Sequence, residues 1–183
     1  MNIDLTSATW EKIEAINIGL CETGRATHGR NSEGYATARE VWEQRPPSAS
    51  VNDALQLARK CHKLAPFLNF NGNTFVAAIG HLINGQIKLP AVQLVSLKSF
   101  AGHYIAGTIT PTEERALTLL LGTGGEPLAV GDRVQSLQGN VRGEIKEILP
   151  DGAVWLKTPN MGTVKTSLDA LVKQPPGRGS ASV

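Results

Sequence analysis

The stretch Val130-Gly131-Asp132-Arg133-Val134, with the chain that follows it to Leu171-Val172, decides the fold of the C-terminal quarter. Apolar and polar residues alternate there in short runs, and turn-forming residues separate the runs, so the stretch predicts β-strands. The expected strands are residues 133–137, 143–149, 153–158, 162–167 and 170–173. Five short strands in so little chain predict a small β-barrel, an architecture that often serves to bind partners.

Within this stretch, Gly131-Asp132-x-Val134 is followed by Gly139, by Gly143-x-Ile145-x-x-Ile148 and by Asp151-Gly152-x-Val154. This order resembles the start of SH3-like barrels of the KOW and Tudor type. The resemblance implies a five-stranded SH3-like barrel that binds nucleic acid or protein. Trp155 is the only aromatic residue of the expected barrel, so the aromatic cage of Tudor domains that bind methyl-lysine is absent. We expect Trp155 to be at least half-buried, with Val154 and Leu156 on the opposite face of its strand.

The chain before this stretch follows a helical period instead and predicts a bundle of about six helices. Two helix starts carry capping residues, Ser50 in one case and Thr110-Pro111-Thr112-Glu113 in the other. A further helix is expected to begin with Asn73 as its cap and to end at Asn84-Gly85 in a left-handed turn, and the alternative for this Asn-Gly pair is a hairpin. The expected helices run from Thr6 or Ser7 to Gly24, from 32 to 44, from Ser50 to Pro66, from Asn73 to Asn84, from Pro90 onward, and from Thr110 to Gly122.

The fold class is therefore expected to be α+β, with a helical domain at residues 1–122 and the SH3-like barrel at residues 128–173. Glycine and proline are dense in residues 123–127, where neither period continues, so this segment is the expected linker. Residues 174–183 are small, polar and rich in proline, which predicts a disordered tail.

The composition is that of an ordinary globular protein, because 41% of the 183 residues are hydrophobic and 19% are charged. No apolar run is long enough to span a membrane, and the N-terminus lacks the basic and apolar segments of a secretory signal. The two cysteines, Cys21 and Cys61, predict neither a disulfide framework nor a metal cluster. We therefore expect a cytoplasmic, bacterial protein without a membrane partner.

Positive charge gathers in the middle of the chain. The formal net charge is only +2, yet residues 54–112 contain no aspartate or glutamate. This segment is either an apolar core segment with little use for acids or a surface that attracts an anion. The basic residues form either a solvated surface or a nucleic-acid interface. The candidates for that interface are Arg25, Arg30, Arg59, Lys60, Lys63, Arg142, Lys146 and Lys165.

The segment Asn69-Phe70-Asn71-Gly72-Asn73 places three asparagines where a helix is expected to begin. Free backbone donors at a helix start favour anions, so Asn71 and Asn73 are candidates for an anion-binding turn. The alternative interpretation is a capped turn that anchors Phe67 and Phe70 inward.

No catalytic motif is recognisable. The four histidines, His28, His62, His81 and His103, lack the close spacing of zinc ligands. Cys61 has basic neighbours, but it lies in an apolar helical stripe, where cysteine usually packs and does not react. We therefore expect no catalytic residue, no metal ligand and no cofactor.

Binding is thus the expected function. The first hypothesis is a non-catalytic nucleic-acid-binding accessory or regulatory factor that takes RNA or DNA. The second is a protein–protein adaptor or inhibitor that uses the helical groove or the barrel edge. An enzyme with an unrecognised site is the third.

Overall fold

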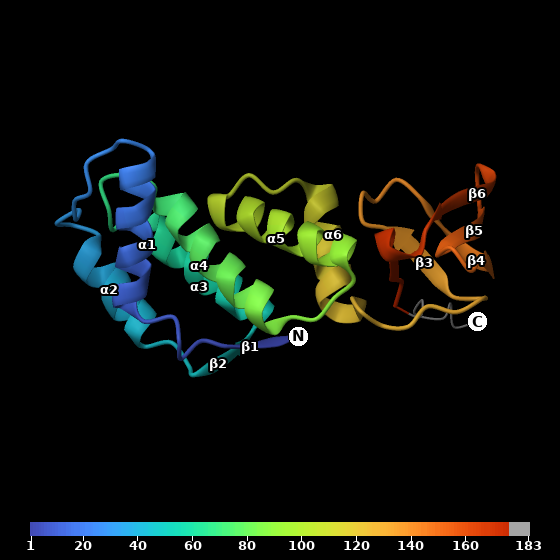
Figure 1. Cartoon of the computed structure of the whole chain (residues 1–183), viewed down its shortest axis with the longest axis horizontal. Coiled ribbons are helices and arrows are strands. Elements are labelled where there is room, and N and C mark those ends of the chain that lie inside the picture. Colours follow the sequence, from blue (N-terminus) through green and yellow to red (C-terminus); the bar gives the residue numbers. More distant parts are fainter. Residues whose placement is uncertain (176–183) are drawn as a thin grey trace, which may run out of the picture. The chain divides into compact units, whose positions relative to one another are not determined.

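A computed structural model describes residues 1–175, within which six α-helices precede a five-stranded antiparallel sheet (Figure 1). The helices are α1 (Trp10–Thr23), α2 (Tyr35–Glu43), α3 (Val51–Lys63), α4 (Asn71–Gln86), α5 (Ala91–Ala106) and α6 (Pro111–Thr123). The sheet contains β3 (Arg133–Ser136), β4 (Arg142–Ile148), β5 (Ala153–Thr158), β6 (Gly162–Ser167) and β7 (Leu171–Lys173). The α+β class and the order of helices before strands are confirmed.

The contacts within the chain divide it into two compact units. The helical unit consists of Met1–Ile87 and Lys98–Ile109, and the sheet unit consists of Lys88–Leu97 and the chain from Thr110 onward. The first part of α5 and all of α6 are therefore grouped with the sheet. Independent folding of residues 1–122 and 128–173, joined by a linker at 123–127, stays a prediction. Of the expected disordered tail, residues 176–183 lie outside the described part of the chain.

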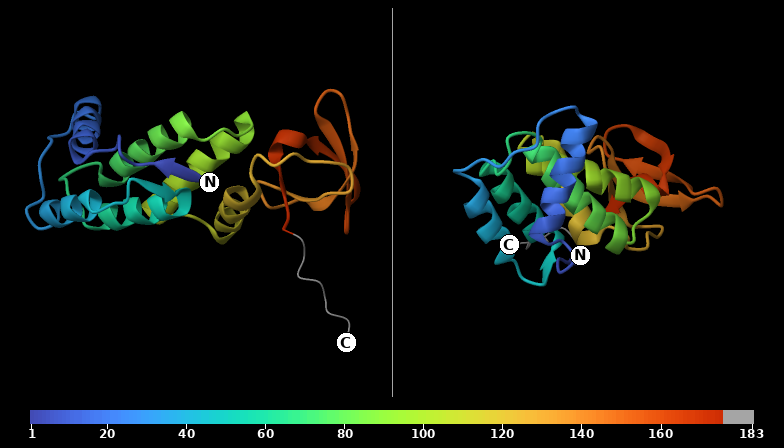
Figure 2. Two further views of the ribbon diagram at one scale, coloured as in Figure 1. Left: turned by 90° about the horizontal axis from the view of Figure 1, so that it is seen from below. Right: turned by 60° about the vertical axis from the view of Figure 1, so that its left-hand side comes forward.

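In the helical unit, α1 and α3 both pack against α4, and α2 packs against α3 (Figure 2). Trp10 and Ile13 of α1, Leu55 of α3, and Phe75 and Ile79 of α4 are buried in the resulting core. These residues recur at helical spacing, which is why one face of each helix is removed from water. A two-stranded antiparallel sheet of β1 (Asn2–Asp4) and β2 (Ser48–Ser50) accompanies the helices. The sequence did not predict it, because a three-residue strand shows no period.

Local capping places some helix starts as expected. The Ser50 hydroxyl accepts a hydrogen bond from the Asp53 backbone N–H at 3.1 Å, and α3 begins at Val51, directly after Ser50. Thr110 and Glu113 form the expected capping box of α6. Helix α1, however, begins at Trp10, because the backbone N–H and hydroxyl of Thr6 are bound to the Asp4 carboxylate. The expected start at Thr6 or Ser7 was therefore wrong.

Both expected ends of α4 were also wrong. The helix begins at Asn71, and its N-cap is Phe70, in a left-handed conformation with φ 57°. At the other end it continues through Asn84-Gly85 to Gln86. The Gln86 side chain accepts a hydrogen bond from the Asp4 N–H at 2.6 Å and donates one to the Asp4 carbonyl at 2.9 Å. This link to β1 lies 82 residues away in the sequence, so no local pattern could predict it.

The strands of the sheet unit agree closely with the predicted strands, whereas closure of the sheet into a barrel stays a prediction. Every strand boundary lies within one residue of the expected one, and the strand order is β6-β5-β4-β3-β7. The buried cluster on one face of the sheet contains Val134, Ile145, Val154, Leu156 and Leu171. Helix α6 packs against β7 within this unit. Among the described residues, none of the helices is long and apolar enough to cross a membrane.

Candidate nucleic-acid interface

Three of the predicted basic residues, Arg59, Lys60 and Lys63, lie together on the C-terminal half of α3. With Gln56 and Tyr104 they line a shallow surface hollow of about 330 Å³, which we call the basic hollow. The opposite face of α3 carries Ala54, Leu55, Ala58 and Cys61, all buried. Burial of that apolar face fixes the rotation of the helix, and the basic side chains are consequently left toward solvent.

The cations of the basic hollow are unpaired in the part of the chain that the structure describes. Within residues 1–175, no carboxylate lies within ion-pair distance of Arg59, Lys60 or Lys63, whereas Arg30, Arg39, Lys146 and Lys173 each pair with one. The Arg59 guanidinium lies over the Tyr104 ring, with Cζ 4.9 Å from the ring centre, so it is held by a cation–π contact. The hollow is therefore a concentration of uncompensated positive charge beside an aromatic ring.

The positive charges of the basic hollow affect the pKa of His62. Burial lowers the pKa of His62, and the positive charges of Arg59 and Lys63 lower it further. Its Nδ1 atom is buried and has no hydrogen-bond partner among the described residues. An anion bound beside Arg59 and Lys63 would offset their charges, and the pKa of His62 would then rise.

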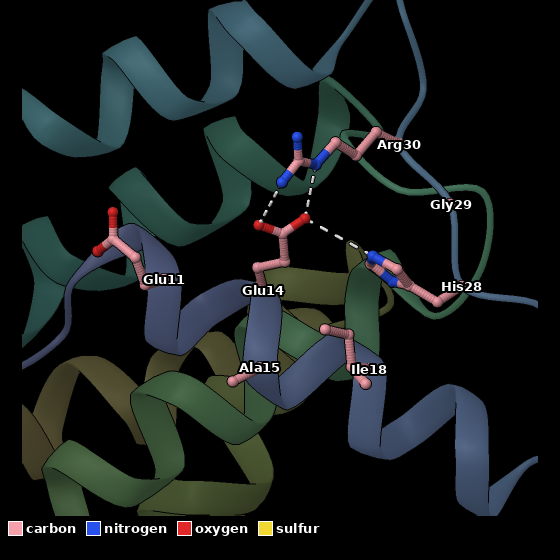
Figure 3. Close-up of a pocket in the computed structure, with 7 residues that line it drawn as sticks. All are labelled: Glu11, Glu14, Ala15, Ile18, His28, Gly29 and Arg30. Carbon is pink, nitrogen blue, oxygen red and sulfur yellow. Dashed lines mark hydrogen bonds and ion pairs between the residues drawn. The ribbon is translucent and has the colours of Figure 1, made fainter.

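The other two predicted cations of the helical unit lie on the loop between α1 and α2. Arg25 is exposed and has a left-handed backbone with φ 53°. Arg30 instead pairs with Glu14 of α1 through its Nε atom at 2.7 Å from Oε1 and its Nη2 atom at 3.0 Å from Oε2 (Figure 3). The Tyr35 hydroxyl donates to the same carboxylate at 2.9 Å. Arg30 therefore forms an intramolecular ion pair.

Glu14, His28 and Arg30 line an open hollow of about 540 Å³ (Figure 3). The hydrogen bond from Arg30 lowers the pKa of the Glu14 carboxyl, so this group is an anion near neutral pH. The His28 Nε2 atom is 3.6 Å from Glu14 Oε1. Because Glu14 already accepts from Arg30 and Tyr35, the cluster is largely self-satisfied and offers an external ligand little unpaired charge.

Asn17 lies at the centre of this network and is fully buried. Its Nδ2 atom donates to the Asn69 carbonyl at 2.8 Å and to the Thr74 hydroxyl at 2.9 Å. The Asn17 Oδ1 atom lies 2.9 Å from His28 Nδ1. Because an amide oxygen only accepts hydrogen bonds, His28 Nδ1 carries the proton of this bond. Sequence reasoning missed Asn17. The available signal was a polar residue at a position of α1 that helical spacing assigns to the core.

The remaining predicted cations, Arg142, Lys146 and Lys165, lie on the sheet. We define the basic sheet face as the face opposite the buried cluster, because strand alternation and register place one group of charged side chains there. Lys146 shares this face because a β-bulge lies between Ile145 and Glu147, and its ammonium pairs with Glu144. The members are Arg133, Arg142, Glu144, Lys146, Glu147, Trp155, Lys157 and Lys165. The three predicted residues are thus on one face.

Trp155 lies in the middle of the basic sheet face. It is half-buried, whereas Val154 and Leu156 point to the other side and are fully buried, as expected. In the sheet register Trp155 stands between Glu147 of β4 and Lys165 of β6. The Lys165 ammonium is 6.0 Å from the centre of the Trp155 ring. An aromatic ring is therefore partly exposed and beside a cation.

The two asparagines of the predicted anion-binding turn differ in what their side chains do. Asn71 Oδ1 accepts from the Phe67 N–H at 2.8 Å, and Asn71 Nδ2 donates to the Phe67 carbonyl at 2.7 Å. Asn73 is exposed. Phe67 is buried and Phe70 is half-buried, which agrees with the inward phenylalanines of the alternative interpretation, although the N-cap of α4 makes no side-chain hydrogen bond. Anion binding by this turn stays a prediction.

Two further kinds of site are a reactive cysteine and a metal centre. Cys61 is buried, and burial raises the pKa of its thiol to about 12, so it is not a thiolate near neutral pH. Within residues 1–175 no group of three or more histidine, cysteine, aspartate or glutamate side chains could hold a metal ion.

Comparison with known proteins finds no relative: no protein-family model, no curated protein and no solved structure matches the chain. The resemblance to SH3-like barrels therefore stays a prediction from the residues between Gly131 and Val154.

Proposed function

We propose that the protein is a non-catalytic accessory or regulatory factor that binds nucleic acid. The observation that carries this proposal is the basic hollow, where Arg59, Lys60 and Lys63 stand together without an acidic partner among the described residues. Leaving three cations unpaired costs free energy through mutual repulsion, and a polyanion would offset that cost. The segment from Ala54 to Thr112 has no acidic residue, so its own sequence does not weaken this attraction.

The proposal includes an SH3-like barrel as the architecture of the sheet unit. In the order β6-β5-β4-β3-β7, four strands follow one another as a meander, and the last strand returns beside the first. Pairing between the first and the last strand of this segment is compatible with a small barrel. The order supports the resemblance that the sequence motifs indicate.

An apolar groove supports the second candidate, a protein–protein adaptor. Ala8 and Ile13 from the N-terminal region and Ala78 and Leu82 of α4 line a hollow of about 410 Å³, with Lys12 and His81 also in its lining. An amphipathic helix of another protein could place one apolar side chain there. The unpaired cations favour nucleic acid over this alternative, because an apolar peptide would leave them uncompensated.

The experiment that tests the proposed function measures binding of short single-stranded and duplex oligonucleotides at several salt concentrations. The parent protein should bind with an affinity that falls as salt increases. The triple variant Arg59→Gln, Lys60→Gln, Lys63→Gln should reduce the slope of log affinity against log salt by up to about 3. The His62 resonances should show a higher pKa when the oligonucleotide is bound to the parent.

The matched control removes the same number of positive charges from three separate places, with Lys12→Gln on α1, Lys88→Gln before α5 and Lys98→Gln on α5. This control should retain most of the salt slope. Equal losses in the two triple variants would show that net charge acts without a defined interface. Absence of salt-dependent binding by the parent would contradict the proposed function and leave the adaptor as the leading candidate.

A further inference from the structure

Trp155 differs from the other two tryptophans of the chain. Trp10 is 2% exposed and Trp42 is fully buried, so both fill the core of the helical unit. Trp155 is half-buried on the face of the sheet opposite its apolar cluster. Large aromatic side chains gain most when they are fully buried, so a tryptophan that keeps a surface toward solvent gives up part of that gain. A bound partner that covers the ring would recover it.

The charges around Trp155 indicate the chemistry of that partner. The basic sheet face holds five basic side chains and two acidic ones among the described strands. One acid, Glu144, is surrounded by cations, and its pKa is lowered first by Lys146 and then by Lys157 and Arg133. The other, Glu147, stands opposite Trp155. Lys157 and Lys165 are exposed and have no carboxylate within ion-pair distance among the described residues, so they remain able to contact phosphates.

We infer that the basic sheet face binds single-stranded nucleic acid, with one base stacked on Trp155 and the neighbouring phosphates near Lys157 and Lys165. This inference rests on the proposed function and names the form of nucleic acid and the residue that contacts a base. An aromatic ring beside cations is the arrangement that proteins use for single strands, because every base has a face that can stack. In a duplex those faces are covered by the neighbouring base pairs, so a duplex cannot occupy Trp155 in this way.

Intrinsic fluorescence provides a direct test, since Trp155 is the tryptophan with solvent exposure and Trp10 and Trp42 are buried. A single-stranded oligothymidine or oligouridine of about 12 nucleotides should quench the emission of the parent protein. A duplex of the same length should leave the emission unchanged. Trp155→Phe should retain most of the affinity for the single strand, because phenylalanine still stacks, and should lose the fluorescence response.

Affinity measurements on further variants complete the test. Trp155→Leu removes the stacking surface and should weaken binding of the single strand by about tenfold or more. Lys157→Gln and Lys165→Gln should each lower the salt slope by about 0.7. The matched control is Lys173→Gln, on β7 of the same sheet, which pairs with Asp132 and should leave the slope unchanged.

The outcomes separate this inference from the proposed function. Salt-dependent binding that depends on the basic hollow, without quenching of Trp155 and without an effect of Trp155→Leu, would overturn the inference and leave the proposed function standing. Equal quenching by single strand and duplex would also overturn it. A parent protein that binds neither form would overturn both. Should Trp155→Leu fail to fold, quenching of the parent and its absence in Trp155→Phe still decide the matter.

Discussion

Two regions of the helical unit use their polar side chains in opposite ways. Around Glu14, the carboxylate, Arg30, Tyr35, His28 and the buried Asn17 are bound to one another or to the backbone. Around α3, the three cations of the basic hollow have no acidic partner among residues 1–175. Mutual satisfaction stabilises a fold, and unpaired charge keeps a surface able to bind. Whether a basic residue stabilises the fold or stays available for binding therefore depends on whether it has an acidic partner.

The largest expected effect comes from the loop that presents His28 and Arg30. A Cβ atom at Gly34 would lie 1.7 Å from the Leu64 carbonyl oxygen, so Gly34→Ala must displace this loop or the segment beneath it. We expect a loss of about 3 kcal/mol in the free energy of unfolding. Urea denaturation followed by circular dichroism measures it.

The control for that change is Gly19→Ala in α1, where an added Cβ has nothing within 4 Å. Alanine has the higher helix propensity, so this variant should gain about 1 kcal/mol. Equal stability of the two variants would show that the loop is not held in the described position.

Removal of the hub of the network should have the next largest effect. Asn17→Ala removes the hydrogen bonds that the buried Asn17 side chain makes with the Asn69 carbonyl, the Thr74 hydroxyl and His28, and should cost about 2–3 kcal/mol. The comparison change is Asn52→Ala on α3, an exposed position, which should alter stability by less than about 0.5 kcal/mol. If both substitutions were equally mild, the buried network would not be the stabilising region.

Glu14→Gln should turn Arg30 from a cation paired with a carboxylate into an unpaired cation. Stability should fall by about 1 kcal/mol near neutral pH, because charge-assisted hydrogen bonds are weakened. The freed Arg30 should raise the salt slope of nucleic-acid binding by up to about 1. An unchanged slope together with reduced stability would mean that Arg30 lies away from the bound nucleic acid.

The same variant has a defined pH dependence. Since Arg30 lowers the pKa of Glu14 from its ordinary value of 4.5, the pair stabilises the protein fully above that pH, and this contribution is lost as pH falls through the lower, folded-state pKa. The difference in stability between the parent and Glu14→Gln should therefore shrink at pH values below about 4.

The smallest expected effect on stability comes from the basic hollow. Arg59→Gln should change the free energy of unfolding by less than about 1 kcal/mol, because no ion pair among the described residues is lost and only the cation–π contact with Tyr104 is removed. The pKa of His62 should rise, since one of the charges that lower it is gone. Nuclear magnetic resonance titration measures that shift, and Lys88→Gln should not produce it.

His62 is also expected to make the stability of the protein depend on pH. Its folded-state pKa lies below the ordinary value of 6.5, so its contribution to stability is complete above that pH and is lost as pH falls toward the folded-state pKa. This loss should be smaller in Arg59→Gln than in the parent.

The elements whose signals are local could be predicted from the sequence. The strand boundaries follow from alternation and turn residues, and the starts of α3 and α6 follow from Ser50 and Thr110, because each depends on atoms a few residues apart. The sequence also shows which residues of the candidate site are basic. Lys146 shares a face of the sheet with Arg142 and Lys165 only because of the bulge between Ile145 and Glu147, which the alternating pattern of the sequence does not contain.

Which polar groups contact one another depends on the packing of the helices and could not be predicted from the sequence. Arg30 finds Glu14 at a separation of 16 residues, Asn17 finds Asn69 at 52, and Gln86 finds Asp4 at 82. The same applies to Tyr104, which lies under Arg59 although α3 and α5 are far apart in the chain. Hydrogen bonds and ion pairs act over a few ångströms in space, and which residues come within that distance is fixed only when the apolar faces of the helices have packed.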